Sequence, residues 1–374
     1  MKILVVDIGP TSGGVERIVD SIYDRLERDK YHIDFLVYGD MCYHEEKYVK
    51  NGNVFKVPKR YCHPIRHYNE VKKFFMIHKD YDVVWIHTRS CSNINAHKFA
   101  RKYTNARIIT HSHAIKPETN GVIHKTIANV LISINQKKLL AYTDYAIGCS
   151  KAAYQYMFGA GYKGEGKVII NGIDLDVFRF NYSVRDAVRK EYGIDEDTTV
   201  IGHIGRFVPV KNHKFIVDMF SHLIKVHPKT CVMFVGDGAE RESVKTYVKK
   251  NKLENSVFFV GEISNTEAYY SAFDVFMLPS MFEGLSLVSI EAQAEGLQSY
   301  ISDDVPEDVI ATDYIYRLNL VEGAEKWAEI IANNLKLYKI DRNLSSDKLR
   351  KTAFDIDNTV EEIKRIFDIG ELCQ

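Results

Sequence analysis

Strand-length apolar runs alternate with helix-length amphipathic segments, twice over, along this chain of 374 residues. A strand, a helix and a further strand form a βαβ unit, in which the two strands are parallel and the helix covers the sheet. The predicted strands are residues 2–8, 32–39, 82–88, 106–112 and 145–150 in the first half, and 199–206, 231–237, 257–262, 275–280 and 299–303 in the second. The pattern therefore predicts an α/β protein with two parallel sheets.

The length favours two domains, because a single hydrophobic core usually stops growing at roughly 250–300 residues. Three glycines crowd residues 161–166 before an Asn-Gly pair at 171–172, as is typical of a boundary turn. We expect an N-terminal domain over residues 1–167 and a C-terminal domain over residues 173–350. A last helical pattern, within residues 358–370, could belong to either one.

Charge is divided unevenly along a chain whose formal net charge is zero. Residues 1–170 contain 26 Lys and Arg against 16 Asp and Glu, whereas the remaining residues contain 24 against 34. Most of the positive excess lies in residues 51–170, which have 19 basic and 6 acidic side chains. A basic face suits an acidic acceptor or an anionic membrane surface, and a solvated face without a partner explains it equally well. No nucleic-acid partner is expected.

Cysteine spacing and hydropathy indicate the compartment. The six cysteines form no C-x-x-C pair, which favours reduced thiols in a cytoplasmic protein. The first predicted strand leads directly into a turn, without the apolar core and cleavage site of a signal peptide. No apolar run approaches the ~20 residues that span a bilayer. We expect a cytoplasmic protein that can lie on the inner face of the membrane without crossing it.

Ligands bind outside the carboxyl ends of the strands in an open parallel sheet, so the loops there should contain the functional residues. Gly13 and Gly14 follow the first strand and precede a helix, whose free N–H groups can bind an anion; a simple tight turn is the alternative. His111 and His113 end the fourth strand and suggest hydrogen bonds to a substrate. A metal site is disfavoured because no third ligand stands at a recognisable spacing, and a surface histidine pair is the remaining alternative.

Two cations follow the first strand of the second half. Arg206 offers a fork of donors that matches phosphate oxygens, and Lys211 adds a point charge before the next helix. Together they predict a diphosphate clamp, with surface charges near a helix start as the alternative.

Two glutamates flank the apolar run of residues 285–290, after a strand. If the helix begins near Leu285, Glu291 lies in its second turn, and a rise of about 1.5 Å per residue separates it from Glu283 by roughly 10 Å. A diphosphate separates a ribose from a sugar by a similar length. Each carboxylate could therefore hold hydroxyls at one end of a nucleotide sugar; a capping glutamate and a surface glutamate are the alternative.

These motifs together resemble glycosyltransferase family 4, retaining enzymes of the GT-B fold. The resemblance covers most of residues 1–300. It depends on GGVE at 13–16, NGID at 171–174, GR at 205–206 with KN at 211–212, VGDG at 235–238, VGE at 260–262, and FEG at 282–284 followed by Glu291. THSHA at 110–114, EAQAEGL at 291–297 and ISDDVPEDV at 301–309 are most similar to transferases of bacterial capsular and exopolysaccharide clusters.

The resemblance implies two Rossmann-like domains whose parallel sheets face each other across a cleft, and it implies a role for each site residue. Arg206 and Lys211 would hold the donor diphosphate, and Glu291 would bind the ribose. Glu283 would contact the donor sugar. The remaining donor-binding positions are the backbone of Phe282, Gly284 and Leu285, the loop of Gly13 and Gly14, and the base-binding turn at Gly261 and Glu262. The family's histidine corresponds to His111 or His113.

The implied function is transfer of a hexose, with retention, from a nucleotide sugar such as a UDP-sugar to a hydroxyl of a growing, lipid-linked oligosaccharide. No metal or cofactor is expected, because the family lacks an Asp-x-Asp site and Asp174-Leu175-Asp176 falls in its linker. The alternatives are a nucleotide-sugar 2-epimerase, a phosphorylase, or a non-catalytic partner in a polysaccharide assembly complex.

Overall fold

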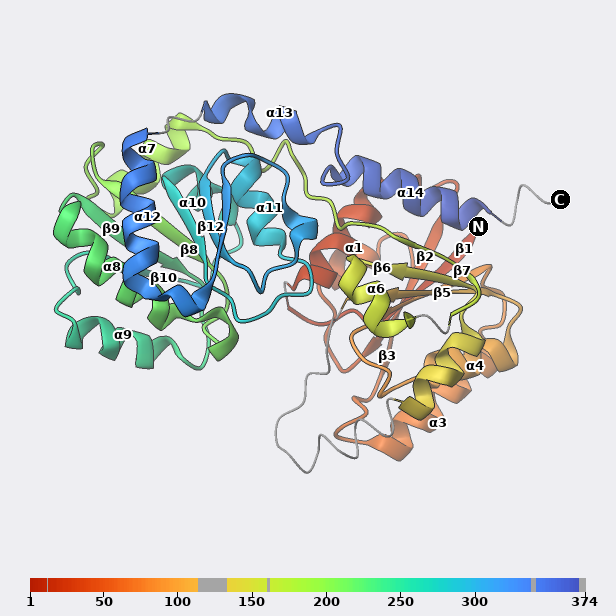
Figure 1. Cartoon of the computed structure of the whole chain (residues 1–374). Helices are drawn as coiled ribbons and strands as arrows, with labels where there is room; N and C mark the ends of the chain where they lie inside the picture. Colours follow the sequence, from red (N-terminus) through yellow and green to blue (C-terminus); the bar gives the residue numbers. More distant parts are fainter. Residues whose placement is uncertain (12, 114–132, 160–161, 338–340, 370–374) are drawn as a thin grey trace. The chain divides into compact units, whose positions relative to one another are not determined.

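The computed structural model describes the chain except for residues 12, 114–132, 160–161, 338–340 and 370–374. The chain forms two compact units, each with one parallel sheet flanked by helices (Figure 1). The first unit combines Met1–Gly172 with Ile356–Gln374, and the second is Ile173–Asp355. The chain therefore passes between units after Gly172 and again after Asp355, where the sequence had suggested residues 167 and 350.

The first sheet has seven strands in the order β3-β2-β1-β4-β5-β6-β7, all of them parallel. Its strands are β1 (Lys2–Val6), β2 (His32–Tyr38), β3 (Val54–Val57), β4 (Val83–Thr88), β5 (Arg107–Ser112), β6 (Tyr145–Gly148) and β7 (Glu165–Val168). Its helices are α1 (Gly14–Arg25), α2 (Glu45–Tyr48), α3 (Pro64–Ile77), α4 (Asn95–Tyr103), α6 (Lys151–Met157) and α14 (Ile356–Asp368). Along β1, β2 and β4, successive apolar side chains point to opposite faces of the sheet, as the pleat requires.

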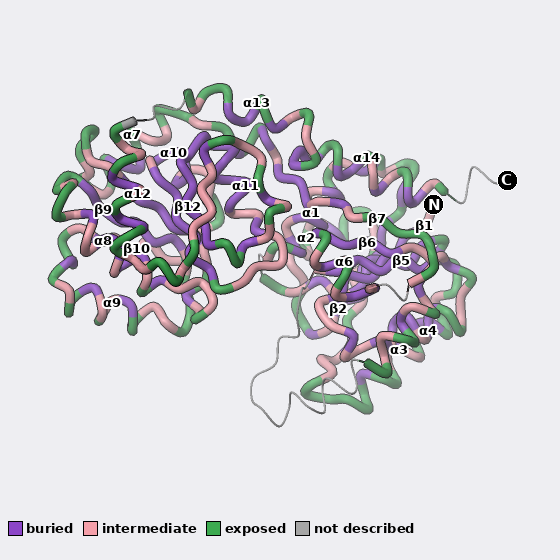
Figure 2. Tube along the Cα trace, viewed as in Figure 1, coloured by how far each residue is buried: buried purple, intermediate pink, exposed green. Residues whose placement is uncertain are grey.

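Helices cover both faces of the first sheet. Helices α1 and α14 pack on the face with Val5 and Trp85, whereas α3 and α4 pack on the face with Val6 and Ile86. The five inner strands, from β2 to β6 in the sheet order, are accordingly buried along most of their length (Figure 2). Helix α14 is the predicted C-terminal helical segment, of which residue 370 lies outside the described residues. It packs on the first unit through Phe367, whose ring meets Trp85 edge-on at 5.4 Å.

The second sheet has six strands, all parallel, in the order β10-β9-β8-β11-β12-β13. Its strands are β8 (Thr199–Ile204), β9 (Thr230–Val235), β10 (Val257–Gly261), β11 (Val275–Leu278), β12 (Gln298–Ser302) and β13 (Ile315–Leu318). Its helices are α7 (Tyr182–Glu191), α8 (His213–Val226), α9 (Arg241–Lys250), α10 (Thr266–Ala272), α11 (Leu287–Ala294), α12 (Gly323–Leu337) and α13 (Ser345–Leu349). The core on one face is built from α8, α9 and α12 around Trp327.

The sequence pattern missed three strands: β3, β7 and β13. Each has four residues, lies at or near a sheet edge, and is only partly buried, so none shows a strong apolar run. Strand β7 lies inside the glycine-rich stretch that we had interpreted as a boundary turn. Glycine suits this strand because a Cβ on Gly166 would meet the Ala146 carbonyl oxygen at 2.7 Å.

Both sheets reverse their strand order at one position. In the first sheet β1 pairs with β2 on one side and with β4 on the other, and in the second β8 pairs with β9 and β11. Chain connections leave in opposite directions from such a switch point, so the loops there diverge and leave room for a ligand. The loops after β1 and β4, and those after β8 and β11, are the expected ligand-binding loops of their units.

We expect Phe367→Ala to lower the free energy of unfolding of the first unit by about 3–5 kcal/mol, because the ring is 1% exposed and its loss leaves a cavity. The chain has two tryptophans, one in each unit, so a Trp327→Phe background leaves Trp85 as the reporter of the first unit. Urea unfolding followed by Trp85 fluorescence makes the measurement. Ile77→Ala, at a side chain 62% exposed, is the control and should change little. An unchanged Trp85 transition in Phe367→Ala would show that α14 does not stabilise this unit.

Candidate active site

The loops after β8 and β11 join at the switch point of the second unit. Strand β8 leads through Gly205 and Arg206 to a 3-10 turn, Pro209–Lys211, which precedes α8. Strand β11 leads through residues 279–286 to α11. The Met281 N–H donates to the Val210 carbonyl oxygen at 2.8 Å, and Lys211 Nζ lies 2.7 Å from Glu283 Oε1. Two residues predicted from separate motifs therefore form an ion pair.

The Lys211–Glu283 pair is shielded but not sealed. The two side chains are 17% and 14% exposed, so their attraction is stronger than that of a surface pair. An ammonium group has three donors, of which Glu283 takes one. Lys211 can therefore hold Glu283 and an anionic ligand at the same time.

Arg206 is exposed at the same edge, and no carboxylate of the described residues forms an ion pair with it. Its loop is held by the neighbouring β9 loop, since Phe207 N–H donates to the Asp237 carbonyl oxygen at 2.9 Å. Gly236 makes this approach possible: its φ is +133°, and a Cβ there would meet the Gly205 carbonyl oxygen at 2.2 Å. The VGDG motif thus sets the spacing of the loops around Arg206.

Helix α11 begins at Leu287, two residues later than expected, because the loop stays non-helical through Ser286. Glu291 still lies in the second turn. Its side chain is 1% exposed, and Oε2 accepts a hydrogen bond of 2.8 Å from the Tyr270 hydroxyl. The surface-glutamate alternative is therefore wrong for Glu291. Its ribose-binding role stays a prediction.

The turn predicted to bind the base lies at the end of β10. Gly261 has a φ of +97°, and its carbonyl oxygen accepts from the Gly236 N–H at 2.8 Å. Glu262 is exposed at this edge. Phe282, Gly284 and Leu285 are partly buried in the loop before α11, so their backbone lies beside Glu283.

In the first unit, the glycine loop after β1 holds an internal carboxylate. Glu16 Oε1 accepts from the Gly9 N–H at 2.7 Å and from Arg89 Nη2 at 2.8 Å, and the side chain is 3% exposed. A Cβ on Gly13 would lie 2.4 Å from Glu16 Oε2, while Gly14 is the first residue of α1. Glycine at position 13 thus leaves room for the carboxylate of Glu16, whose charge also suits the helix N-terminus.

Asp7 lies beside this loop, directly after β1, with a φ of +70°. Burial raises the pKa of Asp7 to about 6, against the opposing attraction of Arg89. A raised carboxyl pKa at the carboxyl edge of a parallel sheet is typical of functional sites.

His111 and His113 join a third histidine, His87, at the ends of β4 and β5. His87 Nδ1 lies 2.9 Å from His113 Nε2, and the rings of His111 and His113 are 4.1 Å apart. Burial lowers the pKa of His111 to about 3 and those of the other two well below the usual value, so all three are neutral at pH 7. The surface-pair alternative is wrong for these histidines.

Two other candidates have local explanations. Asp174 Oδ1 accepts from the backbone N–H groups of Asp176 and Val177, and Asp176 pairs with Arg350, so both carboxylates have local partners in the second unit.

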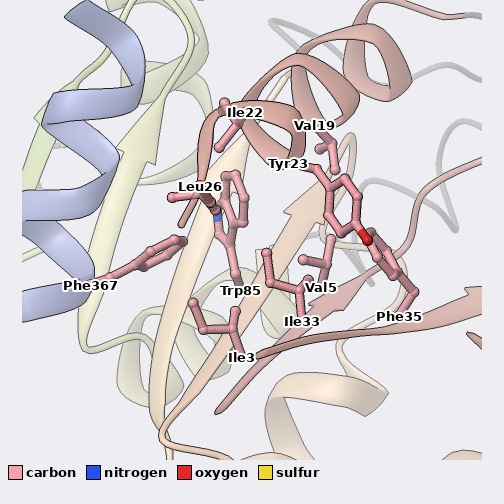
Figure 3. A pocket seen from close by; sticks show the side chains of 10 residues that line it. All are labelled: Ile3, Val5, Val19, Ile22, Tyr23, Leu26, Ile33, Phe35, Trp85 and Phe367. Carbon is pink, nitrogen blue, oxygen red and sulfur yellow. The ribbon is translucent and has the colours of Figure 1, made fainter. Parts of the chain in front are cut away.

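The cavity under α1, about 10 Å³, is lined by ten mainly apolar side chains, including Trp85 and Phe367 (Figure 3). Such a space is too small and too apolar for a sugar or a nucleotide.

Two family models match the chain in succession. The model of Glycosyltransferase Family 4 matches residues 12–177, and the model of Glycosyl transferases group 1 matches residues 184–350. The chain therefore contains a Glycosyltransferase Family 4 domain followed by a Glycosyl transferases group 1 domain. The recognition made from the GGVE, GR, KN and FEG motifs is confirmed.

Two similar proteins are named for glycosyl transfer, and the alignments cover most of the chain. EpsF of Bacillus subtilis (strain 168), which is named as a glycosyltransferase, is 28% identical over 376 residues, or 99% of this chain and 97% of EpsF. The Escherichia coli UDP-Gal:alpha-D-GlcNAc-diphosphoundecaprenol alpha-1,3-galactosyltransferase is 23% identical over 319 residues, which cover 81% of this chain and 79% of the relative.

A solved structure shows the same fold. HepE of Anabaena in complex with UDP-glucose aligns with a TM-score of 0.77 at 18% identity, over 98% of this chain and 99% of HepE. The predicted GT-B fold, with two parallel sheets, is confirmed.

Five residues that lie in these sites were given no role from the sequence alone: Asp7, Glu16, His87, Arg89 and Tyr270. A signal existed for His87, because residues 82–88 and 106–112 were both predicted as strands and both have a histidine near the carboxyl end. For Tyr270 there was none, since its partner Glu291 lies 21 residues away in a different helix.

Asp7→Asn should raise the free energy of unfolding at pH 7 by about 1–3 kcal/mol, because it removes a carboxylate whose ionisation is disfavoured in the fold. A folded pKa above the unfolded value means that the native state keeps its proton longer. In the wild type, the stability that comes from keeping Asp7 protonated is fully present below about pH 4. It is lost as pH rises through about 6. Asparagine also tolerates a positive φ.

Denaturant midpoints at several pH values between about 4 and 7 measure the effect, with exposed Asp29→Asn as the matched control. A loss of stability in Asp7→Asn at every pH would show instead that an ionised Asp7 stabilises the fold.

Proposed function

We propose that this protein is a retaining hexosyltransferase that moves a sugar from a UDP-sugar to a hydroxyl of a growing, lipid-linked oligosaccharide in capsule or exopolysaccharide biosynthesis. The ion pair of Lys211 and Glu283 is the observation on which the proposal depends, because it places a cation and a hydroxyl acceptor side by side at the switch point. The similarity to EpsF and to a galactosyltransferase named for UDP-Gal and a diphosphoundecaprenol-linked acceptor supports the substrate classes.

The donor diphosphate would lie against Arg206 and Lys211. Their charges, with the N–H groups at the start of α11, would stabilise negative charge on the leaving phosphate, so no divalent ion is needed for this step. Glu283 would accept hydrogen bonds from the sugar hydroxyls, and Glu291 from the ribose. The base would lie at the turn of Gly261 and Glu262.

Retention follows if the acceptor attacks on the face from which the phosphate leaves. The bond from the anomeric carbon to the phosphate oxygen breaks, a bond to the acceptor oxygen forms, and the acceptor proton moves to the leaving phosphate. No protein nucleophile takes part. The task of Glu283 is to hold the sugar in position, which contributes through orientation rather than through proton transfer.

The two glutamates should have separable roles. Glu291→Gln should weaken binding of UDP and of the UDP-sugar alike, because both ligands contain the ribose. Glu283→Ala should leave UDP binding nearly unchanged and lower turnover. Losing a hydrogen bond to a charged group costs about 1.5–3 kcal/mol, or roughly ten- to a hundredfold. Calorimetric titration of UDP and UDP-glucose, with a transfer assay, makes the comparison.

Glu295→Gln is the matched control, since Glu295 is also buried, directly after α11, but accepts from Ser271. Its nucleotide binding should equal that of the wild type, and melting curves should show all three variants folded. Equal loss of UDP binding in Glu283→Ala and Glu291→Gln, or no effect in either, would contradict the assignment.

A lipid-linked acceptor requires contact with a membrane, and we propose α3 and the preceding loop as the contact. Their exposed apolar and aromatic side chains are Tyr61, Ile65, Tyr68, Met76 and Ile77, and the exposed basic side chains of α3 are Arg66 and Lys73. Apolar and basic groups on one exposed helix are typical of binding to an anionic interface. No helix in the described part of the chain is long and apolar enough to cross a membrane.

Vesicles of anionic lipid should therefore bind the protein at low salt and release it as salt rises, because each near-surface cation contributes about 1 kcal/mol that salt screens. Ile65→Asp with Ile77→Asp should weaken binding by at least about tenfold, since burying one such side chain is worth about 1.5–3 kcal/mol. Val321→Asp, at an apolar side chain 92% exposed in the second unit, is the control. Equal sedimentation of all three proteins with vesicles would exclude α3 as the contact.

A further inference from the structure

Three histidines stand on one face of the first sheet at its carboxyl edge. His111 and His113 are two residues apart on one extended segment, so their side chains point to the same side. His87 lies opposite His111 in the register of the parallel strands β4 and β5. The backbone also fixes the position of His113 beside the end of β4, because the His113 N–H donates to the Thr88 carbonyl oxygen at 3.0 Å. The strand pairing itself thus brings the three imidazoles together.

The described protein groups leave several of the imidazole nitrogens unsatisfied. His87 and His111 are 2% and 1% exposed, yet Nε2 of His87 and both ring nitrogens of His111 have no hydrogen-bond partner in the structure. A buried, unpartnered polar atom costs free energy, and such atoms are rare in native proteins. One nitrogen from each ring can be chosen so that all three lie within 4.8 Å of one another.

A metal ion would satisfy these nitrogens. Zinc bonds to histidine at about 2.0–2.1 Å, which places tetrahedral ligand atoms about 3.3 Å apart, so small side-chain rotations suffice. The group contains no carboxylate or thiolate among the described residues, and ligands made only of imidazole suit zinc, copper, nickel or cobalt rather than magnesium or calcium.

We propose that His87, His111 and His113 bind one divalent transition-metal ion, with zinc as the preferred ion. Three histidines on neighbouring strands leave a fourth coordination position for water. The ion would cross-link the carboxyl ends of β4 and β5. The sequence disfavoured a metal at His111 and His113 because no third ligand stood at a recognisable spacing. His87 supplies that ligand from the neighbouring strand.

The inference is independent of the proposed glycosyl transfer, whose leaving group is assigned to Arg206 and Lys211 in the second unit. Metal binding can therefore fail without affecting UDP binding, and UDP binding can fail without affecting the metal. If a histidine binds the donor sugar directly instead, its substitution would weaken the sugar donor and leave metal content unchanged.

The test uses the full chain without a histidine tag, stripped by a chelator and titrated with Zn²⁺ or Co²⁺. We expect one equivalent of tightly bound metal after gel filtration, a visible Co²⁺ spectrum of nitrogen coordination, and a Tm that rises with metal concentration. His87→Ala should weaken binding by at least about 10–100-fold. His111→Phe should abolish the Tm rise while its metal-free Tm stays at or above that of the wild type, because the ring loses only unpartnered nitrogens.

His32→Ala, at an exposed histidine of the same unit, and Cys62→Ser, at an exposed thiol, control for surface binding and should retain the metal. The proposal is overturned if the stripped wild type binds less than a stoichiometric amount of both ions. It is also overturned if His87→Ala and His111→Phe bind as much metal as the wild type.

Discussion

Parallel strand pairing determines where chemistry can occur in this protein. Every strand of a parallel sheet ends at the same edge, so segments far apart in the chain are brought together there. In the second unit this places Lys211, which follows β8, 2.7 Å from Glu283, which follows β11. In the first unit the same constraint brings Arg89 after β4 to Glu16 at the start of α1, and His87 to His111. Lys211 meets Glu283, and Arg89 meets Glu16, where the strand order reverses, whereas His87 meets His111 because β4 and β5 are direct neighbours.

Close approach of backbone segments is the second requirement of these edges. Gly236 lets the β9 loop touch the β8 loop, and Gly13 leaves room for the carboxylate of Glu16. A side chain at either position would displace a group that holds a charged residue of the site. The glycines of the family motifs therefore act through the position of other residues, at least as much as through direct contact with a ligand.

The carboxyl edges of the two sheets differ in the charge and burial of their polar side chains. The second unit keeps the Lys211–Glu283 pair charged and partly exposed, which suits the binding of an anionic donor. The first unit buries the neutral imidazoles of His87 and His111 against Trp85 and leaves nitrogens without partners among the described residues. A charged, accessible edge and a neutral, buried cluster are suited to different ligands, a diphosphate in one case and a metal ion in the other.

The sequence by itself determined the fold class, because apolar periodicity is a local property that survives without knowledge of neighbours. It also identified four candidate donor-binding residues, since each has a fixed offset from a predicted strand or helix: Arg206, Lys211, Glu283 and Glu291. Only the tertiary structure decided which of these residues touch: Glu283 pairs with Lys211, whereas Glu291 is buried against Tyr270. The sequence also failed to predict the short edge strands β7 and β13, because a partly buried strand has no continuous apolar run. His87 shows the same limit most clearly, since its partners depend on the register of β4 against β5, and register is a long-range property that no local pattern contains.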